Sequence, residues 1–314
     1  MLPTGRDGEG IVVVLLATYN GARFLDDQLA SIAAQGWPRI DIWASDDGSS
    51  DETTAILGAW RGRWGKGTFS IHAGPGRGFA ENFRALLTGY DGDADYYAFC
   101  DQDDIWDEDK LSCAVARLAA QPRAQAALYC SRTRLVDEGG TPIGMSPLFA
   151  RRPAFRNALV QSIAGGNTMV VNRAGFAILA ESARRTAFVS HDWWAYLLVS
   201  GAGGAVCYDP EPHVSYRQHQ ENLVGNNVGF RARTGRLRRL IAGQLSDWNA
   251  ANLAALECCA DLLTDGNRAV AAQFRAARTA GLPERLLGIA RSRVYRQTRL
   301  QSATLWLAAA VNRL

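Results

Sequence analysis

Short apolar runs and amphipathic stretches alternate four times within residues 11–120 of the chain. The apolar runs occupy 11–20, 40–45, 68–74 and 95–100, and the stretches with helical spacing occupy 21–35, 52–60, 78–90 and 109–120. The first run, IVVVLLATYN, is continuous and β-branched, which is typical of a strand buried on both faces. Strand–helix alternation of this kind predicts βαβ units and therefore an α/β fold with a doubly wound, mostly parallel sheet.

Polar sequences follow three of the four predicted strands. They read TYNG after the first strand, DDGSSD after the second and DQDD after the fourth. In open α/β sheets, ligands bind in the crevice beyond the carboxyl ends of the strands. The sequence therefore predicts that these polar residues meet at one edge of the sheet and form a ligand site there.

The DQDD sequence places three carboxylates, Asp101, Asp103 and Asp104, directly after a buried strand. Clustered carboxylates resist burial unless a positive charge neutralises them. Asp101 and Asp103 form an Asp-x-Asp motif of hard oxygen ligands, which suits Mg²⁺ or Mn²⁺ completed by phosphate oxygens of a substrate. The alternative is a set of acids that favours a helix N-terminus. It explains Asp107 and Asp109, but not the two aspartates that precede them.

The pattern is less regular after residue 125. We expect a hairpin turning at Glu138–Gly140, a strand at 167–172, a helix at 190–202, a strand at 213–219, and an aperiodic, glycine- and asparagine-rich mobile loop at 219–230. From Arg231 onward the sequence has a helical pattern and is rich in alanine and arginine. We therefore divide the chain into an α/β domain, residues 1–225, and a helical C-terminal appendage, residues 226–314.

The two parts differ in charge. Residues 226–314 hold 14 arginines, no lysine and five acidic residues, a net charge of +9, whereas residues 1–225 carry a net charge of −6. Such a split suggests different partners for the two parts. We expect the tail to dock on an anionic membrane surface, the alternative being a helical bundle or homodimer interface with a solvated basic face. The expected apolar stripe comprises Leu287, Ala290, Val294 and Leu305, with Arg285, Arg296 and Arg299 opposite.

Several classes of protein do not fit the sequence. The six cysteines show no CxxC pair and no zinc spacing, which indicates reduced thiols. The start of the chain lacks the apolar core of a signal peptide, and no apolar run approaches the roughly 18 residues of a membrane span. We therefore expect a cytoplasmic protein, peripheral on the inner face of the cell membrane if the tail binds lipid. Without a helix-turn-helix, zinc or RNA-binding signature, the basic tail does not predict a nucleic-acid partner.

Six motifs, in order along residues 10–225, resemble glycosyltransferase family 2. TYNG, SDDGSSDET, FCDQDDIW and HDWW resemble its inverting members, and NTMVVNR and YRQHQENLVG resemble its bacterial rhamnosyltransferase-like branch, which builds cell-surface polysaccharides. The resemblance implies a GT-A fold, a nucleoside-diphospho sugar as donor and Mn²⁺ or Mg²⁺ as cofactor. It favours dTDP-L-rhamnose as the donor, and a hydroxyl of a polysaccharide or lipid-linked saccharide as the acceptor.

The resemblance also implies roles for individual residues. The implied nucleotide-binding residues are Thr18, Tyr19, Asn20, Asp47, Arg77 and Asp101. The implied metal ligands are Asp101, Asp103 and His219. The implied donor-sugar and acceptor contacts are Gly166, Asn167, Trp193 and Trp194. Asp192, in SHDWW, matches the general base that removes a proton from the acceptor.

Alternatives stay open at this point. The structural alternatives are turn-holding by Asp46, loop-holding by Asn82, helix capping by Asp192, core packing by Trp193 and Trp194, and a plain hydrogen bond by His219. A sugar nucleotidyltransferase shares the nucleotide domain and the metal aspartates, but LLATYNGARF lacks the glycine-rich triphosphate loop expected there. A catalytically inactive sugar-nucleotide or polysaccharide-binding protein is the other alternative, against which the intact Asp103 and Asp192 argue.

Overall fold

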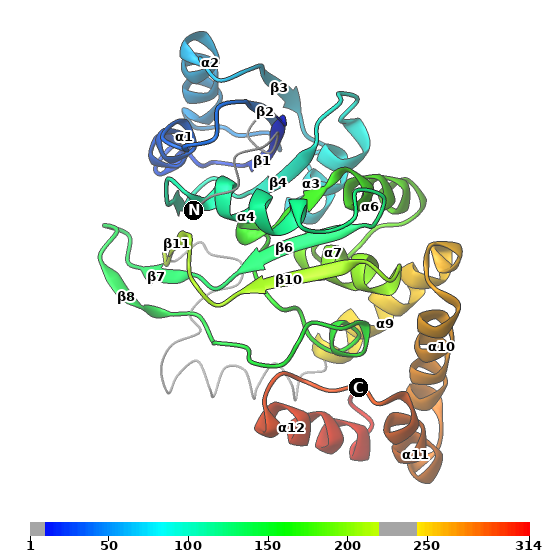
Figure 1. The fold of residues 1–314 in the computed structure, drawn as a ribbon. Helices are drawn as coiled ribbons and strands as arrows, with labels where there is room; N and C mark the ends of the chain where they lie inside the picture. The colour runs from blue at the N-terminus through cyan, green and yellow to red at the C-terminus, as the bar shows by residue number, and fades with distance from the viewer. Residues whose placement is uncertain (1–9, 220–243) are drawn as a thin grey trace.

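The main sheet has seven strands in the order β10–β6–β9–β4–β1–β2–β3, in a computed structural model that describes residues 10–219 and 244–314. The strands are β1 (Val12–Thr18), β2 (Ile40–Asp46), β3 (Phe69–Ala73), β4 (Tyr96–Cys100), β6 (Ala127–Ser131), β9 (Val170–Asn172) and β10 (Ala205–Asp209). β9 runs antiparallel to its neighbours β4 and β6, and the other pairs of this sheet are parallel. The predicted α/β fold with a mostly parallel sheet is confirmed (Figure 1).

Helices cover both faces of this sheet because its central strand is apolar on both faces. Val13 and Leu15 of β1 belong to one buried cluster with α3, and the intervening Val14 belongs to the other cluster, with α1, α2 and α4. These helices are α1 (Leu25–Ala33), α2 (Thr53–Arg63), α3 (Phe79–Gly89) and α4 (Lys110–Ala119). All four helices predicted within residues 21–120 are therefore present.

A second, smaller sheet stands at the carboxyl edge of the main one, in the order β5–β11–β7–β8. Its strands are β5 (Ile105–Trp106), β7 (Arg134–Val136), β8 (Pro142–Met145) and β11 (Val214–Arg217). β7 and β8 form the predicted hairpin around Glu138–Gly140, and β11 pairs with β5 antiparallel and with β7 parallel. Because β5 directly follows the DQDD sequence, this sheet brings the end of β11 beside the acidic residues.

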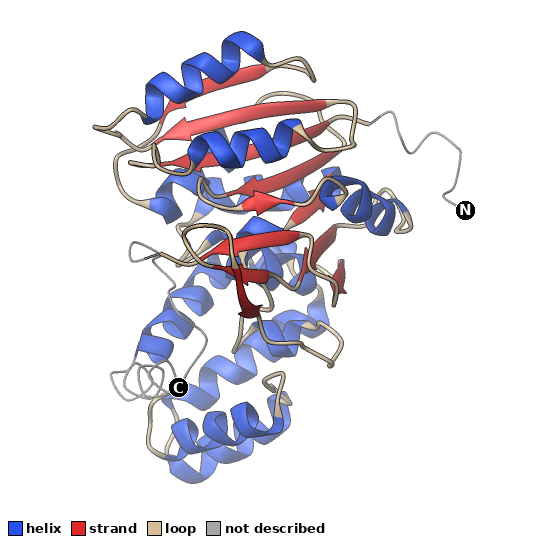
Figure 2. Cartoon of the chain, turned by 90° about the vertical axis from the view of Figure 1, so that its left-hand side faces the viewer, coloured by secondary structure: helices blue, strands red, loops and turns tan. Residues whose placement is uncertain are grey.

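The later helices pack on the α3 side of the main sheet. They are α5 (Phe155–Ala158), α6 (Arg173–Arg185), α7 (His191–Gly201), α9 (Gln244–Cys258), α10 (Asp265–Thr279), α11 (Leu282–Ser292) and α12 (Arg299–Ala310), with the short 3₁₀ helices η1 (Gly166–Thr168) and η2 (Ala260–Leu262). Leu253, Phe274 and Leu305 of the C-terminal helices share one apolar cluster with Val13 of the sheet. The C-terminal helices therefore continue the core of the sheet domain. Figure 2 shows helices packed below the sheet at the C-terminal end of the chain. The predicted boundary at 225/226, and the predicted loop beyond His219, lie outside the described residues.

The apolar stripe expected along the C-terminal segment is wrong. Val294 and Leu305 are buried, and so is Arg285, whose guanidinium donates to the carbonyl oxygens of Ala309 and Ala280 at 3.0 and 2.7 Å. The reason is a break in the helix: α11 ends at Ser292, Arg293 has a φ of 52°, and α12 begins only at Arg299. Within the described ranges, no helix is long and apolar enough to cross a membrane.

Candidate active site

Polar side chains bind the carboxyl ends of β1 and β2 to each other. Thr18 Oγ1 donates to Asp46 Oδ1 at 2.9 Å, and Asp46 Oδ2 accepts from the backbone N–H of Ser49 at 2.9 Å. Asn82, on α3, donates to the carbonyl oxygen of Ser45 at 2.9 Å and accepts from the Ser45 hydroxyl at 2.6 Å. Asp46 thus holds the turn, which is the structural role that the sequence left open for it. Asn82 fixes the strand ends rather than the loop before α3.

Asp47 closes the loop that carries Arg77. The two carboxylate oxygens of Asp47 accept from the backbone N–H groups of Gly76 and Gly78, each at 2.7 Å. Both glycines have positive φ angles, 66° and 88°, which a residue with a side chain rarely adopts. Arg77 lies between them and is exposed at this edge of the sheet. The structure therefore gives Asp47 a loop-holding role besides its predicted contact with the nucleotide.

The turn after β1 is bound to the acidic loop through Gln102. Its side-chain amide accepts from the backbone N–H of Tyr19 at 2.7 Å and donates to the backbone carbonyl of Tyr19 at 2.9 Å. The Tyr19 ring itself is 57% exposed, and the neighbouring Asn20 has a φ of 46°. A Cβ at Gly21 would lie 2.2 Å from Gln102 Oε1, so the glycine of TYNG makes room for this contact. The sequence motifs did not single out Gln102, although it lies within DQDD.

The three predicted metal ligands include two that are in direct contact. His219 Nε2 lies 2.7 Å from Asp103 Oδ2, and both side chains are largely buried. Burial, together with the negative charges of Asp103 and Asp192, raises the pKa of Asp101 to about 7, and the charge of Lys110 opposes this shift. Carboxylates crowded in this way call for a positive charge between them. The donor set of two carboxylates and one imidazole suits Mn²⁺, and with less preference for nitrogen also Mg²⁺.

Asp104, which the motifs left without a role, holds the acidic loop from within. It is fully buried, and its Oδ2 accepts from Asn167 Nδ2 at 2.5 Å while its Oδ1 accepts from the backbone N–H of Arg217 at 3.2 Å. The Arg217 guanidinium in turn donates to the Asp103 carbonyl and to Asp27 Oδ2, each at 3.0 Å. The structure thus places the Asn167 amide against the acidic loop, where it positions Asp104.

Lys110 is a buried cation beneath the same loop. Its ammonium lies 3.0 Å from the centroid of the Trp106 ring and makes no hydrogen bond within the described part of the chain. Burial lowers the pKa of Lys110 to about 7, and the neighbouring groups Cys100, Asp104 and Asp101 oppose this shift. Lys110 therefore supplies part of the positive charge that the acidic loop needs.

Asp192 lies in the first turn of α7, two residues after the N-cap residue Ser190. Asp192 is therefore not the N-cap residue of α7, and its structural alternative as a helix cap is wrong. Its Oδ1 accepts from the backbone N–H of Trp193 at 2.7 Å, and burial raises the pKa of its carboxyl group above the usual value. Because its charge acts on Asp101, the structure brings Asp192 to the same site as the acidic loop.

The residues beside Asp192 are packed in the core. The Trp193 indole N–H donates to the Ala158 carbonyl at 2.7 Å, and that of Trp194 donates to the Ser182 hydroxyl at 2.9 Å. Both rings are at most 4% exposed, which agrees with the core alternative, so neither presents a flat face to an acceptor here. His191 is also buried, and a Cβ at Gly166 would lie 1.8 Å from its Nε2.

Comparison with known proteins agrees with this geometry. Residues 13–183 match the family model described as Glycosyl transferase family 2, as the sequence motifs predict. The protein named dTDP-rhamnosyl transferase RfbG, from Shigella flexneri, is 29% identical over 237 residues, which cover 71% of this chain and 78% of RfbG. An uncharacterized protein of Mycobacterium tuberculosis is 25% identical over 215 residues, which cover 67% of this chain and 59% of that protein.

Solved structures agree with the fold. TarS of S. aureus (residues 1–349) in complex with UDP-GlcNAc matches with a TM-score of 0.60 at 14% identity, over 96% of this chain and 88% of TarS. The mannosyltransferase PcManGT of Pyrobaculum calidifontis, in complex with GDP-Man and Mn²⁺, matches with a TM-score of 0.52 at 19% identity, over 99% of this chain and 88% of that one. The expected GT-A fold is confirmed.

Proposed function

The chain belongs to glycosyl transferase family 2 and is therefore a nucleotide-sugar glycosyltransferase, and we propose that it works as an inverting, metal-dependent rhamnosyltransferase. Its donor would be dTDP-L-rhamnose, and its acceptor a hydroxyl of a cell-surface polysaccharide or lipid-linked saccharide. The name of the S. flexneri relative, a dTDP-rhamnosyl transferase, supports the donor.

One observation carries the proposal more than any other. Side chains from three distant parts of the sequence converge on the acidic loop: Asp103 after β4, His219 after β11, and Asp192 on α7. Asp103 contacts His219 directly, and Asp192 is close enough to Asp101 to raise its pKa. A divalent cation site next to a carboxylate base would supply both functions of a metal-dependent inverting transfer, which are stabilisation of the leaving group and removal of the acceptor proton.

The donor nucleotide would lie along the carboxyl ends of β1 and β2. Tyr19 offers an exposed ring for stacking, and Thr18 and Asn20 on either side of it line the same turn. Arg77 is exposed on the loop that Asp47 closes, where its guanidinium suits a diphosphate. Gly166 is buried, and its missing side chain makes room for the His191 ring rather than for a donor sugar.

Asp101, Asp103 and His219 would hold the metal ion. When bound, Mn²⁺ or Mg²⁺ withdraws charge from the diphosphate leaving group as a Lewis acid. The fit rests on the 2.7 Å contact between Asp103 and His219, and on the burial and negative neighbours that raise the pKa of Asp101 despite the opposing charge of Lys110. Arg217 and Asn167 keep the loop in place by binding the Asp103 carbonyl and the Asp104 carboxylate.

Asp192 would take the proton from the attacking acceptor hydroxyl. Inversion requires a base on the face of the sugar opposite the leaving group. The carboxyl group of Asp192 has a pKa above its usual value because it is buried, and a carboxylate with a raised pKa is a stronger base. One of its oxygens already accepts from the Trp193 N–H, which fixes the orientation of the carboxylate.

A donor screen tests the proposal. Release of nucleoside diphosphate from dTDP-L-rhamnose, UDP-GlcNAc and GDP-mannose would be measured with Mn²⁺, with Mg²⁺ and with EDTA. We expect dTDP-L-rhamnose to be turned over fastest, and EDTA to abolish turnover. Equal turnover with EDTA would contradict metal dependence. Release of pyrophosphate from dTTP and a sugar phosphate, without release of a nucleoside diphosphate from any of the three donors, would instead indicate a sugar nucleotidyltransferase.

A further inference from the structure

Helix α12 presents an apolar face to solvent. Leu300, Leu307 and Val311 are 76%, 60% and 58% exposed, and Ala303 and Ala310 are exposed as well. Their spacing of three, four and seven residues places them on one side of a helix, with Trp306, 39% exposed, at its margin. These six residues, the α12 outer face, therefore form a continuous apolar surface, which is unusual on a helix that faces water.

The rest of the protein holds this face in place. Leu305, Ala308 and Ala309, on the opposite side of α12, are buried in the core. Thr298 and Gln301 form a capping box at the start of the helix, and the buried Arg285 binds the Ala309 carbonyl near its end at 3.0 Å. The α12 outer face is thus displayed by a packed helix, so it needs no rearrangement to become accessible.

The segment that carries the α12 outer face is rich in arginine and contains no acidic residue. Residues 285–314 contain six arginines and no lysine, aspartate or glutamate. Arg291, Arg299 and Arg313 are exposed, while Arg285 is buried. No ion pair joins Arg291, Arg299 or Arg313 to an acidic side chain within residues 10–219 and 244–314, so an apolar face is combined there with positive charge.

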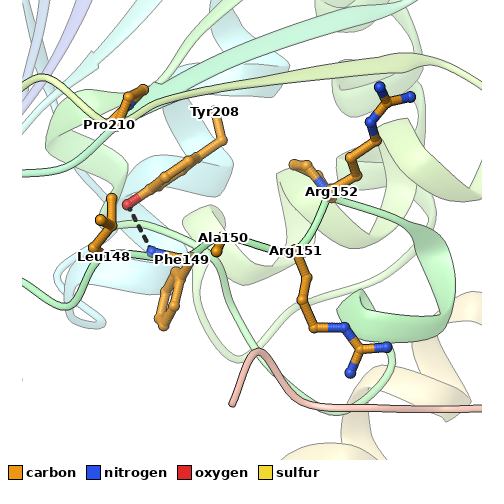
Figure 3. Close-up of a pocket in the computed structure, with 8 residues that line it drawn as sticks. Leu148, Phe149, Ala150, Arg151, Arg152, Tyr208 and Pro210 are labelled. Atoms are coloured by element: carbon orange, nitrogen blue, oxygen red, sulfur yellow. Dashed lines mark hydrogen bonds between the residues drawn. The ribbon is translucent and has the colours of Figure 1, made fainter.

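An open pocket of about 370 Å³ adds to this basic surface (Figure 3). Its walls are Leu148, Phe149, Ala150, Arg151, Arg152, Pro153, Tyr208 and Pro210. Arg151 connects it to the α11–α12 link: its guanidinium donates to the Arg296 carbonyl at 3.2 Å and stacks 3.7 Å from the Tyr295 ring centroid. Tyr208 lies near the carboxyl end of β10, so the pocket extends from the α12 side toward the edge of the sheet where the active site lies.

We propose that the α12 outer face lies in the interface of an anionic lipid membrane, with Arg291, Arg299 and Arg313 among the lipid headgroups. Apolar side chains flanked by arginines match such an interface in both hydrophobicity and charge. A second copy of the chain is a poorer occupant, because it would bring the same acid-free, arginine-rich segment against this one. This inference rests on the proposed function, because docking would hold the enzyme beside a lipid-linked acceptor.

Flotation of the full-length protein with liposomes tests the docking. We expect recovery with vesicles of phosphatidylcholine and phosphatidylglycerol, weaker recovery in high salt, and little recovery with phosphatidylcholine alone. Substituting Leu300→Gln, Leu307→Gln and Val311→Gln together should lower the partition coefficient at least about tenfold, because three inserted apolar side chains are lost. Arg291→Gln with Arg299→Gln and Arg313→Gln should remove the dependence on phosphatidylglycerol. The matched control is Ile143→Gln with Met145→Gln on β8, whose side chains are 48% and 44% exposed, and it should float like the wild type.

Other results would overturn the inference. Equal flotation of the wild type and the triple-Gln variant, or no flotation of the wild type, would exclude docking through α12. A dimer in light scattering that the triple-Gln variant loses would assign the face to a second copy instead. Quenching of tryptophan fluorescence by brominated lipid, reduced by Trp306→Phe, gives a readout that does not depend on the triple variant folding. Release of dTDP from dTDP-L-rhamnose is measured on the same samples without vesicles. This measurement distinguishes a failure of the proposed function from a failure of docking.

Discussion

At the scale of single residues, the three carboxylates of DQDD differ in what they contact. Asp103 contacts His219, and Asp101 is crowded by the charges of Asp103 and Asp192. Asp104 is fully buried and is held by Asn167 and the Arg217 backbone. Identical side chains within four positions therefore divide into two proposed metal ligands and one residue that fixes the loop.

The crowding of Asp101 predicts a dependence of stability on pH. Its pKa in the folded protein is about 7, against 3.8 in the unfolded chain, so the folded state holds the proton more strongly between these values. The free energy of unfolding of the metal-free protein should therefore fall as pH rises from about 4 to 7. Asp101→Asn should remove this loss and be more stable than the wild type at pH 8 by roughly 1–3 kcal/mol, discounted for partial exposure.

Urea unfolding in EDTA at pH 4.5 and pH 8 measures this effect. The two proteins should differ little at pH 4.5, where Asp101 is protonated in the folded state. With Mn²⁺ at pH 8 the order should reverse, because only the wild type keeps the full set of ligands. An Asp101→Asn variant that is less stable than the wild type in EDTA at pH 8 would show that the charge of Asp101 does not destabilise the folded state.

Substitution of His219 tests the third metal ligand. His219→Ala should raise the Mn²⁺ concentration needed for half-maximal turnover by at least about tenfold, and leave metal-free nucleotide binding unchanged. Its effect should be larger with Mn²⁺ than with Mg²⁺, because nitrogen is the softer ligand. His213→Ala is the matched control: that imidazole binds Asp109, 2.9 Å away, instead of the acidic loop. An equal Mn²⁺ requirement in the two variants would restrict His219 to a hydrogen bond with Asp103.

At the scale of elements, the close contact between η1 and α7 makes a specific steric prediction. Gly166 does not need a positive φ, so the obstacle to a side chain there is the His191 ring, whose Nε2 would lie 1.8 Å from an added Cβ. Gly166→Ala should cost roughly 1–3 kcal/mol of stability by overpacking. In a His191→Ala background the same substitution should cost less than about half as much, because the obstructing ring is gone. Urea unfolding of the four proteins of this cycle measures the coupling, and additive costs would contradict a direct steric conflict.

The elements also show which parts of the fold could be predicted. The first four strands and helices are correctly predicted because long apolar runs such as 12–18 form strands wherever they are buried, independently of distant partners. The apolar stripe over α11 and α12 could not be predicted, because the left-handed turn at Arg293 breaks the helix. Arg285 is buried for a similar reason: its partners, the Ala309 and Ala280 carbonyls, are supplied by the tertiary fold.

At the scale of the whole molecule, the candidate site is predictable only in part. Motifs identify Asp101, Asp103, His219 and Asp192, because each follows or begins a recognisable element. Sequence alone does not identify the residues that position them. Gln102 and Arg217 act through contacts with partners more than 80 residues away, namely Tyr19 and Asp103. The sequence leaves open whether the Trp193 and Trp194 rings face inward or toward an acceptor, since their partners, Ala158 and Ser182, lie on other helices.

The central claim, that Asp192 is the base of a metal-dependent sugar transfer, is tested most directly by Asp192→Asn. The measurement is the turnover of dTDP-L-rhamnose with Mn²⁺, followed by release of dTDP, together with the Kd of the donor. We predict that turnover falls by a factor on the order of 10²–10⁴, the usual contribution of a positioned base, and that the Kd changes by less than about twofold. Turnover within about threefold of the wild type, or loss of donor binding together with turnover, would contradict the assignment of Asp192 as the base.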